Sequence, residues 1–354
     1  MRTIVKREIK NYLKRPLFWI GVLIVILGIY QNLRPYLMIP YISSEKEFVQ
    51  DNPETVYDAD ITDGYVPTKE GDRRNLWEET VQKRLISDFN MEQIEAQNVI
   101  KEMRKMNIKD ACTYLEKKYH YYNAIYSWED TAYHRGTKKE INSYIKSNLE
   151  HKSFSYYFSR KFADFSGLYM AFFATVMLAF LFWQDTRKNT YELLHTKPVS
   201  AEKYILGKII GGYSVCLIVL AILNLIFWTI CCVYTKNSGF EVNLLDFLVA
   251  TGLYILPNML MIVCVYGLVS LLFKNPIPAV PILILYMVYS NMGSKNAEGM
   301  FGYYGRPFAI MVRFPGRFFD VTPPPMAMLN QSFLLLASIG ILLLCMQLWK
   351  RRRM

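Results

Sequence analysis

The chain has 354 residues, 52% of them hydrophobic, and a formal net charge of +11. Residues 39–161 hold 19 basic and 21 acidic side chains, so the basic surplus lies outside this block, beside uncharged apolar runs. This segregation excludes a single soluble core. Basic clusters that border apolar runs indicate membrane topology and disfavour a nucleic-acid partner.

Residues 1–15 carry six Lys and Arg interspersed with apolar side chains. We expect four side chains of this segment to lie on membrane lipids while the basic side chains reach water. The four are Val5, Ile9, Tyr12 and Leu13. Residues 16–38 contain the first apolar run, 16–36, and no small-residue cleavage site follows it. The run therefore predicts a retained membrane helix and not a signal peptide.

The polar block 39–161 predicts a mostly helical extracellular domain. Beyond residue 73 its apolar side chains recur at helical spacing in two stripes. They are Leu76, Trp77, Val81, Leu85 and Phe89, then Ile94, Val99, Ile100 and Met103. Thr137 and Glu140 have the spacing of a capping box. The acidic residues 58–63 lack the Gly and Glu positions of an EF-hand, which favours a solvated loop over a calcium site.

Aromatic residues between 119 and 133 allow two interpretations. Tyr121, Tyr122, Tyr126 and Trp128 are either a ligand-facing wall or part of the core of this domain, and the core is the favoured interpretation.

Residues 162–354 contain five further apolar runs, which gives six predicted transmembrane helices in an all-α membrane protein. The runs are 162–183, 209–233, 246–273, 276–292 and 331–349. Pro257 and Asn258 predict a kink in the fourth helix, and the fifth has only 14 clean apolar residues. Lys and Arg near the span ends number 16 on one side and six on the other. With six spans, this bias predicts cytoplasmic termini and an extracellular 39–161 domain.

Motifs for enzyme chemistry are missing from the sequence. It has four His, no HExxH, no GxSxG and no phosphate-binding GxxxxGK[ST] loop. Five of the six Cys lie in or beside apolar runs, without CxxC spacing. We therefore predict no enzyme activity, no metal and no cofactor in this chain. Any ATP is expected to bind to a partner protein.

The loop 184–208 combines a short helix with a sharp stop. Residues 190–195 can form this helix, Pro198 ends it, and Ser200 followed by Glu202 predicts the cap of the next helix. The resulting elbow presents Tyr191 and the Leu193–Leu194 pair to a partner groove. The alternative is a loop that lies on the lipid surface.

Residues 192–200, with Lys203 and Gly207–Lys208, resemble the coupling-helix loop of type 2 ABC transporter permeases. Residues 6–18 are similar to the amphipathic connecting helix of that family. The resemblance covers residues 1–30 and 160–354. It implies a coupling helix that binds cytoplasmic ABC ATPase subunits through Thr190, Tyr191, Glu192, Leu193 and Leu194. It also implies a second permease subunit, as a homodimer or heterodimer, and short re-entrant helices in an outer segment, 290–330.

Two hypotheses for function remain open. In the first, the chain is the permease of an ATP-driven exporter in the cell membrane that moves amphipathic substrates such as antimicrobial peptides or lipids. In the second, it is a membrane-anchored sensor or immunity protein whose 39–161 domain binds an extracellular peptide. Dependence on ATP hydrolysis by the partner distinguishes the two.

Overall fold

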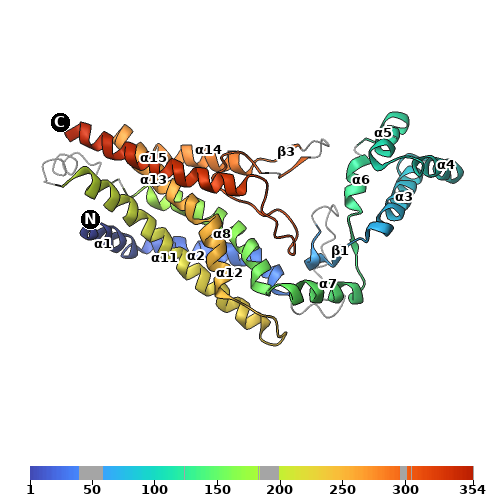
Figure 1. The fold of residues 1–354 in the computed structure, drawn as a ribbon, viewed down its shortest axis with the longest axis horizontal. Helices are drawn as coiled ribbons and strands as arrows, with labels where there is room; N and C mark the ends of the chain where they lie inside the picture. The colour runs from blue at the N-terminus through green and yellow to red at the C-terminus, as the bar shows by residue number, and fades with distance from the viewer. Residues whose placement is uncertain are drawn as a thin grey trace. The chain divides into compact units, whose positions relative to one another are not determined.

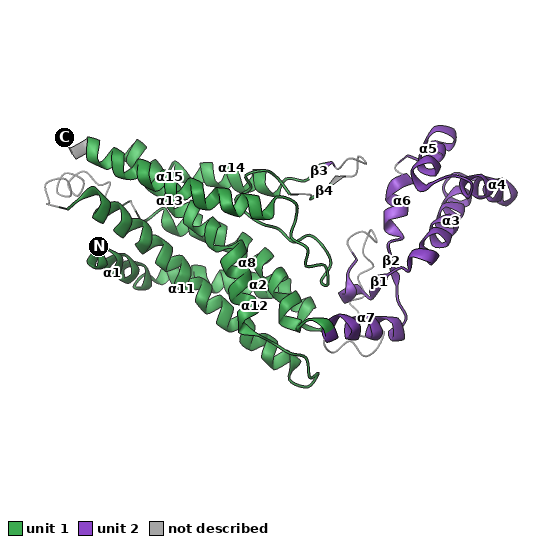
Figure 2. Cartoon of the chain, in the orientation of Figure 1, with its two compact units in different colours: residues 1–40, 151–294, 301–354 green, residues 41–150, 295–300 purple. Residues whose placement is uncertain are grey.

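A computed structural model describes residues 1–39, 59–122, 124–181, 183, 199–295, 301–303 and 305–353, and Figure 1 shows its ribbon coloured along the chain. The chain divides into two compact units (Figure 2). Unit 1 comprises residues 1–40, 151–294 and 301–354, and unit 2 comprises residues 41–150 and 295–300. Unit 1 contains the long apolar helices, and unit 2 contains most of the polar block.

Unit 1 is mainly α-helical. Its helices are α1 (Arg2–Leu13), α2 (Pro16–Leu37), α8 (Phe154–Leu178), α11 (Ala201–Thr235), α12 (Leu244–Tyr254), α13 (Leu256–Phe273), α14 (Ala279–Asn291) and α15 (Ala327–Arg353). The short strands β3 (Ser294–Lys295) and β4 (Phe301–Gly302) pair with each other. Helix α13 packs along α15, α1 along α11, and α2 and α12 against α8.

Five segments among the described residues are long and apolar enough to cross a bilayer: α2, α8, α11, the α12–α13 pair and α15. Helix α14 has 13 residues, which gives about 20 Å at 1.5 Å per residue, against a hydrocarbon core of about 30 Å. The chain is therefore a mostly helical, multi-pass membrane protein. A sixth crossing by α14 stays a prediction.

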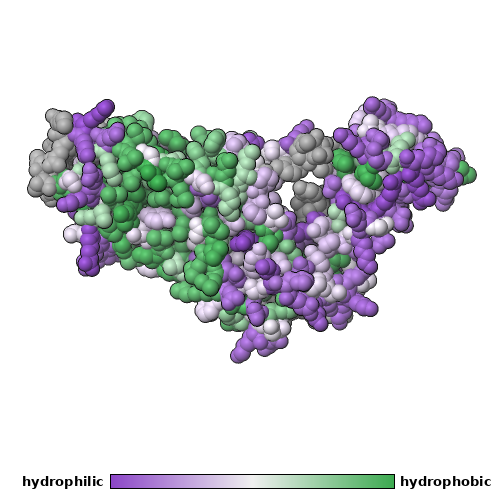
Figure 3. Space-filling model, in the orientation of Figure 1, coloured by the Kyte–Doolittle hydropathy of each residue, from purple (hydrophilic) through white to green (hydrophobic). Residues whose placement is uncertain are grey.

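Helix α2 shows why these helices suit lipid. One face is buried, with Phe18, Ile29 and Leu33 at most 1% exposed, yet Leu23 and Ile24 on the other face are 55% and 61% exposed. A helix that is apolar on every face is suited to a lipid environment. Figure 3 shows hydrophobic residues over the middle of the visible surface of unit 1, with hydrophilic residues at its ends, whereas the visible surface of unit 2 is largely hydrophilic.

The kink predicted at Pro257 and Asn258 is confirmed as a break between α12 and α13 at Ile255, which has φ −117° and ψ −41°. Proline has no N–H and its ring crowds the preceding turn, so the helix cannot continue unchanged. Asn258 Nδ2 donates to Tyr254 O at 2.8 Å and supplies a partner for a carbonyl at the break.

The segment between β4 and α15 differs from expectation. Residues 305–326 contain no helix, so the short re-entrant helices are not found there. Prolines at 307, 315 and 323–325 divide this segment into short pieces, and proline in a helix interior removes a hydrogen bond and causes a clash. The segment is nevertheless packed: Ile310, Met311 and Phe314 are buried, and the carboxylate of Asp164 pairs with the guanidinium of Arg313.

Unit 2 is a small helical domain with one two-stranded sheet. Its elements are the 3-10 helix η4 (Ile61–Asp63), β1 (Tyr65–Pro67), α3 (Glu70–Ser87), α4 (Gln93–Met103), α5 (Ile108–Tyr119), α6 (Ala124–Asp130), β2 (Tyr133–Arg135) and α7 (Lys138–His151). Strands β1 and β2 are antiparallel. The predicted capping box at the start of α7 is confirmed, since Thr137 N donates to Glu140 Oε2 at 2.8 Å and Glu140 N to Thr137 Oγ1 at 3.4 Å.

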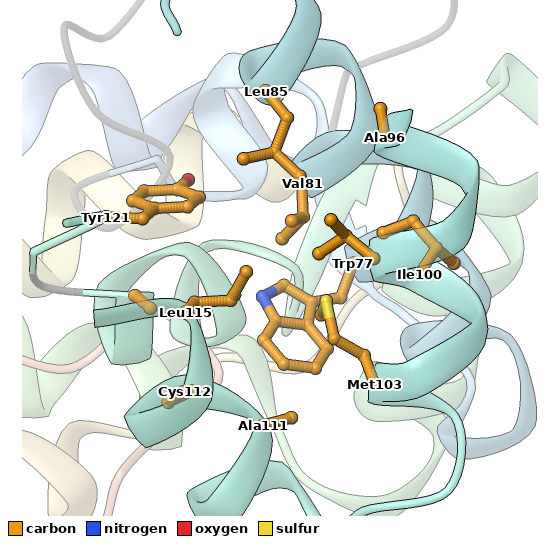
Figure 4. Close-up of a cluster of buried hydrophobic side chains, with 12 residues drawn as sticks. Trp77, Val81, Leu85, Ala96, Ile100, Met103, Ala111, Cys112, Leu115 and Tyr121 are labelled. Atoms are coloured by element: carbon orange, nitrogen blue, oxygen red, sulfur yellow. The ribbon is translucent and has the colours of Figure 1, made fainter. Parts of the chain in front are cut away.

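The core of unit 2 surrounds Trp77 (Figure 4), which is fully buried and donates from Nε1 to Ser127 Oγ at 2.9 Å. Tyr121 belongs to this cluster and Trp128 packs against it, so the core interpretation is confirmed for these two aromatics. Tyr122 is 68% exposed. Ile94, predicted in the second stripe, is 73% exposed, because five residues of helix rotate it about 140° from Val99.

Candidate functional site

The predicted ATPase contact, Thr190 to Leu194, lies outside the described residues. The helices on either side of it are described, and the predicted cap of the second is confirmed: Lys203 N donates to Ser200 Oγ at 3.4 Å at the start of α11. The candidate site is the place where α1, the end of α8 and the first turns of α11 meet. We call it the α1–α11 junction and define it by residues 4–12, 177–181 and 201–212.

Two glycines allow α1 to approach α11 closely. A Cβ atom on Gly207 would lie 3.0 Å from Ile4 Cβ, and one on Gly211 would lie 2.9 Å from Glu8 Cβ. Both separations are shorter than ordinary carbon–carbon contacts. Gly207 and Gly211 have GxxxG spacing, which allows close packing against α1, as small residues do where membrane helices meet.

Glu8 and Lys208 form a buried ion pair at the centre of the junction. Lys208 Nζ lies 2.8 Å from Glu8 Oε1, and the two side chains are 4% and 8% exposed respectively. The same ammonium donates to Leu181 O at 3.1 Å, just beyond the end of α8. Desolvating two ions costs several kcal/mol each, so the pair favours the one arrangement of α1, α8 and α11 that satisfies both charges.

The pair was not predicted from the sequence. Glu8 is the only acidic residue among six basic ones in residues 1–15, and this exception was the only available signal. The predicted third apolar run began at residue 209, whereas α11 begins at Ala201 and places Lys208 inside a helix.

Tyr12 was predicted to lie on the lipid face of α1, and this prediction was wrong. It is 4% exposed and its hydroxyl donates to Met177 O at 3.1 Å, so it faces the helix bundle. Burial, followed by the nearby Glu8 charge, raises the pKa of Tyr12 well above its ordinary value, which keeps the hydroxyl protonated as a donor. Its place follows from spacing: Tyr12 lies one turn after Glu8 and shares its face. Val5, Ile9 and Leu13 are half-buried on a different face.

The C-terminal helix reaches the same end of the bundle. The Tyr204 and Trp349 rings stack with centroids 4.1 Å apart, and Lys350 Nζ lies 3.1 Å from Glu202 Oε1. The basic residues of α1, of the first turns of α11 and of the end of α15 are therefore gathered at one end of unit 1. Among the described residues, no three His, Cys, Asp or Glu side chains form a potential metal site.

A family model described as "ABC-2 family transporter protein" matches residues 2–305. The matched range begins in α1, runs through unit 2 and the α1–α11 junction, and ends beyond β4. No curated protein and no solved structure matches the chain significantly.

Proposed function

This chain belongs to the ABC-2 family of transporter proteins, and we propose that it is the membrane subunit of an exporter that moves amphipathic substrates, such as antimicrobial peptides or lipids. Separate cytoplasmic ATPase subunits bind and hydrolyse ATP, because this sequence has no phosphate-binding loop. Two permease subunits, identical or different, complete the transporter. The observation that carries the proposal is the family match, which includes the α1–α11 junction.

Coupling to the ATPase starts at Thr190 to Leu194. When ATP closes the ATPase subunits, movement of this segment acts on the end of α8 and the start of α11. The Glu8–Lys208 pair and the glycine contacts transmit the movement to α1. The helices that flank the ATPase contact therefore move as a group against the second permease subunit.

The ATPase contact is tested by replacing Tyr191, Leu193 and Leu194 together with Asp. The purified permease should lose its co-purifying ATPase, because the substitutions remove the apolar side chains that are proposed to contact it. Its helical content should be unchanged. The matched control places Asp at Tyr122, Ile86 and Ile94, exposed side chains of unit 2. Retention of the ATPase by the first variant would overturn the assignment of the coupling helix.

The proposed orientation places the termini in the cytoplasm and the 39–161 domain outside. Its support is the 16-to-six bias of basic residues and their gathering at one end of unit 1. Single cysteines at Ile94 and Lys203 test it with a membrane-impermeant thiol reagent, since five native cysteines are buried and only Cys232 is partly exposed. Ile94→Cys should be labelled on intact cells, and Lys203→Cys only after permeabilisation. The reverse pattern would refute the topology.

Unit 2 is proposed to sample the cargo. Its β1–β2 sheet, α3 and α7 line a groove of about 830 Å³. Val66, Leu76 and Tyr144 give the groove apolar surface, and Lys69 and Asp72 add charges of both signs. Mixed apolar and charged surface suits an amphipathic ligand. Deleting residues 45–150 should therefore alter cargo handling and leave the ATPase bound.

The same groove supports the second hypothesis, a sensor or immunity protein that sequesters extracellular peptide through the 39–161 domain. Energy use separates the two functions. If the chain exports cargo, protection of cells should stop when the partner ATPase carries a substitution that abolishes hydrolysis. Protection that persists with the inactive ATPase would favour sequestration.

A further inference from the structure

Helix α1 presents three stripes of side chains at four-residue spacing, and side chains so spaced share a helix face. The first stripe contains Glu8 and Tyr12 and faces the bundle. The second is apolar and half-buried: Val5, Ile9 and Leu13. The third is basic and exposed: Arg2, Lys6 and Lys10, continued by Lys14 at the C-cap.

The apolar and basic stripes together border a shallow, open groove along α1, with a volume of about 590 Å³. Its lining contains four basic side chains and no acidic one. The carboxylate of α1, Glu8, is buried on the bundle face and pairs with Lys208. Among the described residues, none that lines the groove balances its positive charge, and the groove therefore favours an anionic occupant.

The level of the groove relative to the bilayer can be inferred from the neighbouring helix α2. Trp19 is 46% exposed and its Nε1 donates to Leu13 O at 2.9 Å, which joins the start of α2 to the end of the apolar stripe. Trp is enriched where membrane and water meet. From Ile20 onwards α2 exposes apolar side chains suited to acyl chains. The groove therefore lies at the level of the lipid headgroups.

We propose that the α1 groove binds the anionic headgroups of phospholipids in the leaflet on which α1 lies. The basic stripe pairs with headgroup phosphates while Val5, Ile9 and Leu13 contact the upper acyl chains. The positive charge of the groove and its position at the level of the headgroups both favour this occupant. This proposal rests on the proposed function as a membrane subunit, because it requires α1 to lie on a bilayer. Because α1 is joined to α11 through Glu8 and Lys208, bound headgroups fix the position of the helix that follows the coupling segment.

The experiment uses the full chain, without its ATPase, in phosphatidylcholine nanodiscs that contain spin-labelled phosphatidylglycerol or spin-labelled phosphatidylcholine. The native chain should immobilise a larger fraction of phosphatidylglycerol. The triple variant Lys6→Glu, Lys10→Glu and Lys14→Glu should bind both lipids equally, since each basic residue at an anionic surface contributes about fivefold to binding. Raising the ionic strength should weaken the native preference.

The matched control makes the same change of net charge in unit 2, with Lys101→Glu, Lys109→Glu and Lys117→Glu, all at exposed positions. It should keep the native preference. The proposal is overturned if the native chain shows no preference, if the α1 variant keeps it, or if the control loses it equally. If the α1 variant keeps the lipid preference and, in a separate co-purification with the ATPase, loses that partner, the groove docks an acidic surface of the ATPase.

The lipid measurement contains no ATPase, and co-purification through Thr190 to Leu194 requires no particular lipid. A failure of the headgroup proposal is therefore distinguishable from a failure of the proposed function.

Discussion

Replacing Lys208 with Met should destabilise the α1–α11 junction by about 3–5 kcal/mol, the usual cost of removing one member of a buried ion pair. Met has an unbranched side chain but lacks the ammonium that lies 2.8 Å from Glu8 Oε1. It also removes the donor to Leu181 O. The carboxylate is then left in a site that is 8% exposed without its cation.

Glu8→Gln should cost less, about 1–3 kcal/mol, because Lys208 keeps its bond to Leu181 O and the Gln oxygen still accepts a hydrogen bond. The double variant, Glu8→Gln with Lys208→Met, carries no charge at either position. Its cost should therefore fall below the sum of the two single costs by about 0.5–3 kcal/mol, the range of measured couplings between residues in contact.

The assay is reversible unfolding of the purified chain in mixed micelles, followed by circular dichroism, for the native chain, both single variants and the double variant. Lys350→Met is the matched control. It breaks an ion pair with Glu202 in which both side chains are 58% exposed, and such pairs contribute about 0–1 kcal/mol. Additive costs at positions 8 and 208, or a Lys208→Met cost no larger than that of the control, would refute the argument that the buried pair fixes the junction.

Three further perturbations test other contacts. Gly211→Ala places a Cβ 2.9 Å from Glu8 Cβ and should cost about 1–3 kcal/mol in the same assay, whereas Gly252→Ala meets no atom within 4 Å and should cost nothing. Trp77→Ala empties the core of unit 2 and should cost about 3–5 kcal/mol, seen as rapid proteolysis of unit 2 with the ATPase still bound. Hydrogen bonds from its capping-box partner lower the pKa of Glu140, so the cap stabilises α7 above the ordinary Glu pKa and is lost as pH falls through the lowered value. Thermal unfolding of native and Glu140→Gln chains between pH 7 and pH 3 should converge at the acidic end, and parallel curves would contradict this.

The apolar runs were sufficient to predict the long helices but not where they begin. The predicted run 209–233 lies inside α11, which starts at Ala201 because the Ser200 cap precedes two helical turns that contain the charged residues Glu202, Lys203 and Lys208. Likewise α8 begins at Phe154, eight residues before the predicted run, where Ser153 Oγ accepts from Tyr156 N at 3.1 Å. Hydropathy identifies the residues that lie in the hydrocarbon core, whereas capping determines where a helix starts. The two signals therefore begin at different residues.

Contacts between distant segments were not predictable from local patterns. Glu8 and Lys208 are 200 positions apart, and no spacing rule within either segment relates them. In unit 2 helical periodicity identified Trp77 and Met103 correctly because they lie on faces set by 3.6 residues per turn. The periodicity did not exclude Ile94, since an apolar residue on a solvent face leaves the same signal as one in the core.

The length of α11 explains why an ion pair at this position suits the proposed coupling. Its 35 residues extend about 52 Å, roughly 20 Å more than the hydrocarbon core. Lys208 lies about 11 Å from the first residue at the usual helical rise, within the part of α11 that the core does not need to hold. The pair therefore clamps α11 close to where it leaves the bilayer. When the segment before Ser200 is displaced, either α1 moves with α11 or the pair breaks. Lys208→Met tests whether transport requires the joint movement, because the variant lacks the pair that holds α1 to α11. Coupled transport should fail in that variant while the ATPase stays bound.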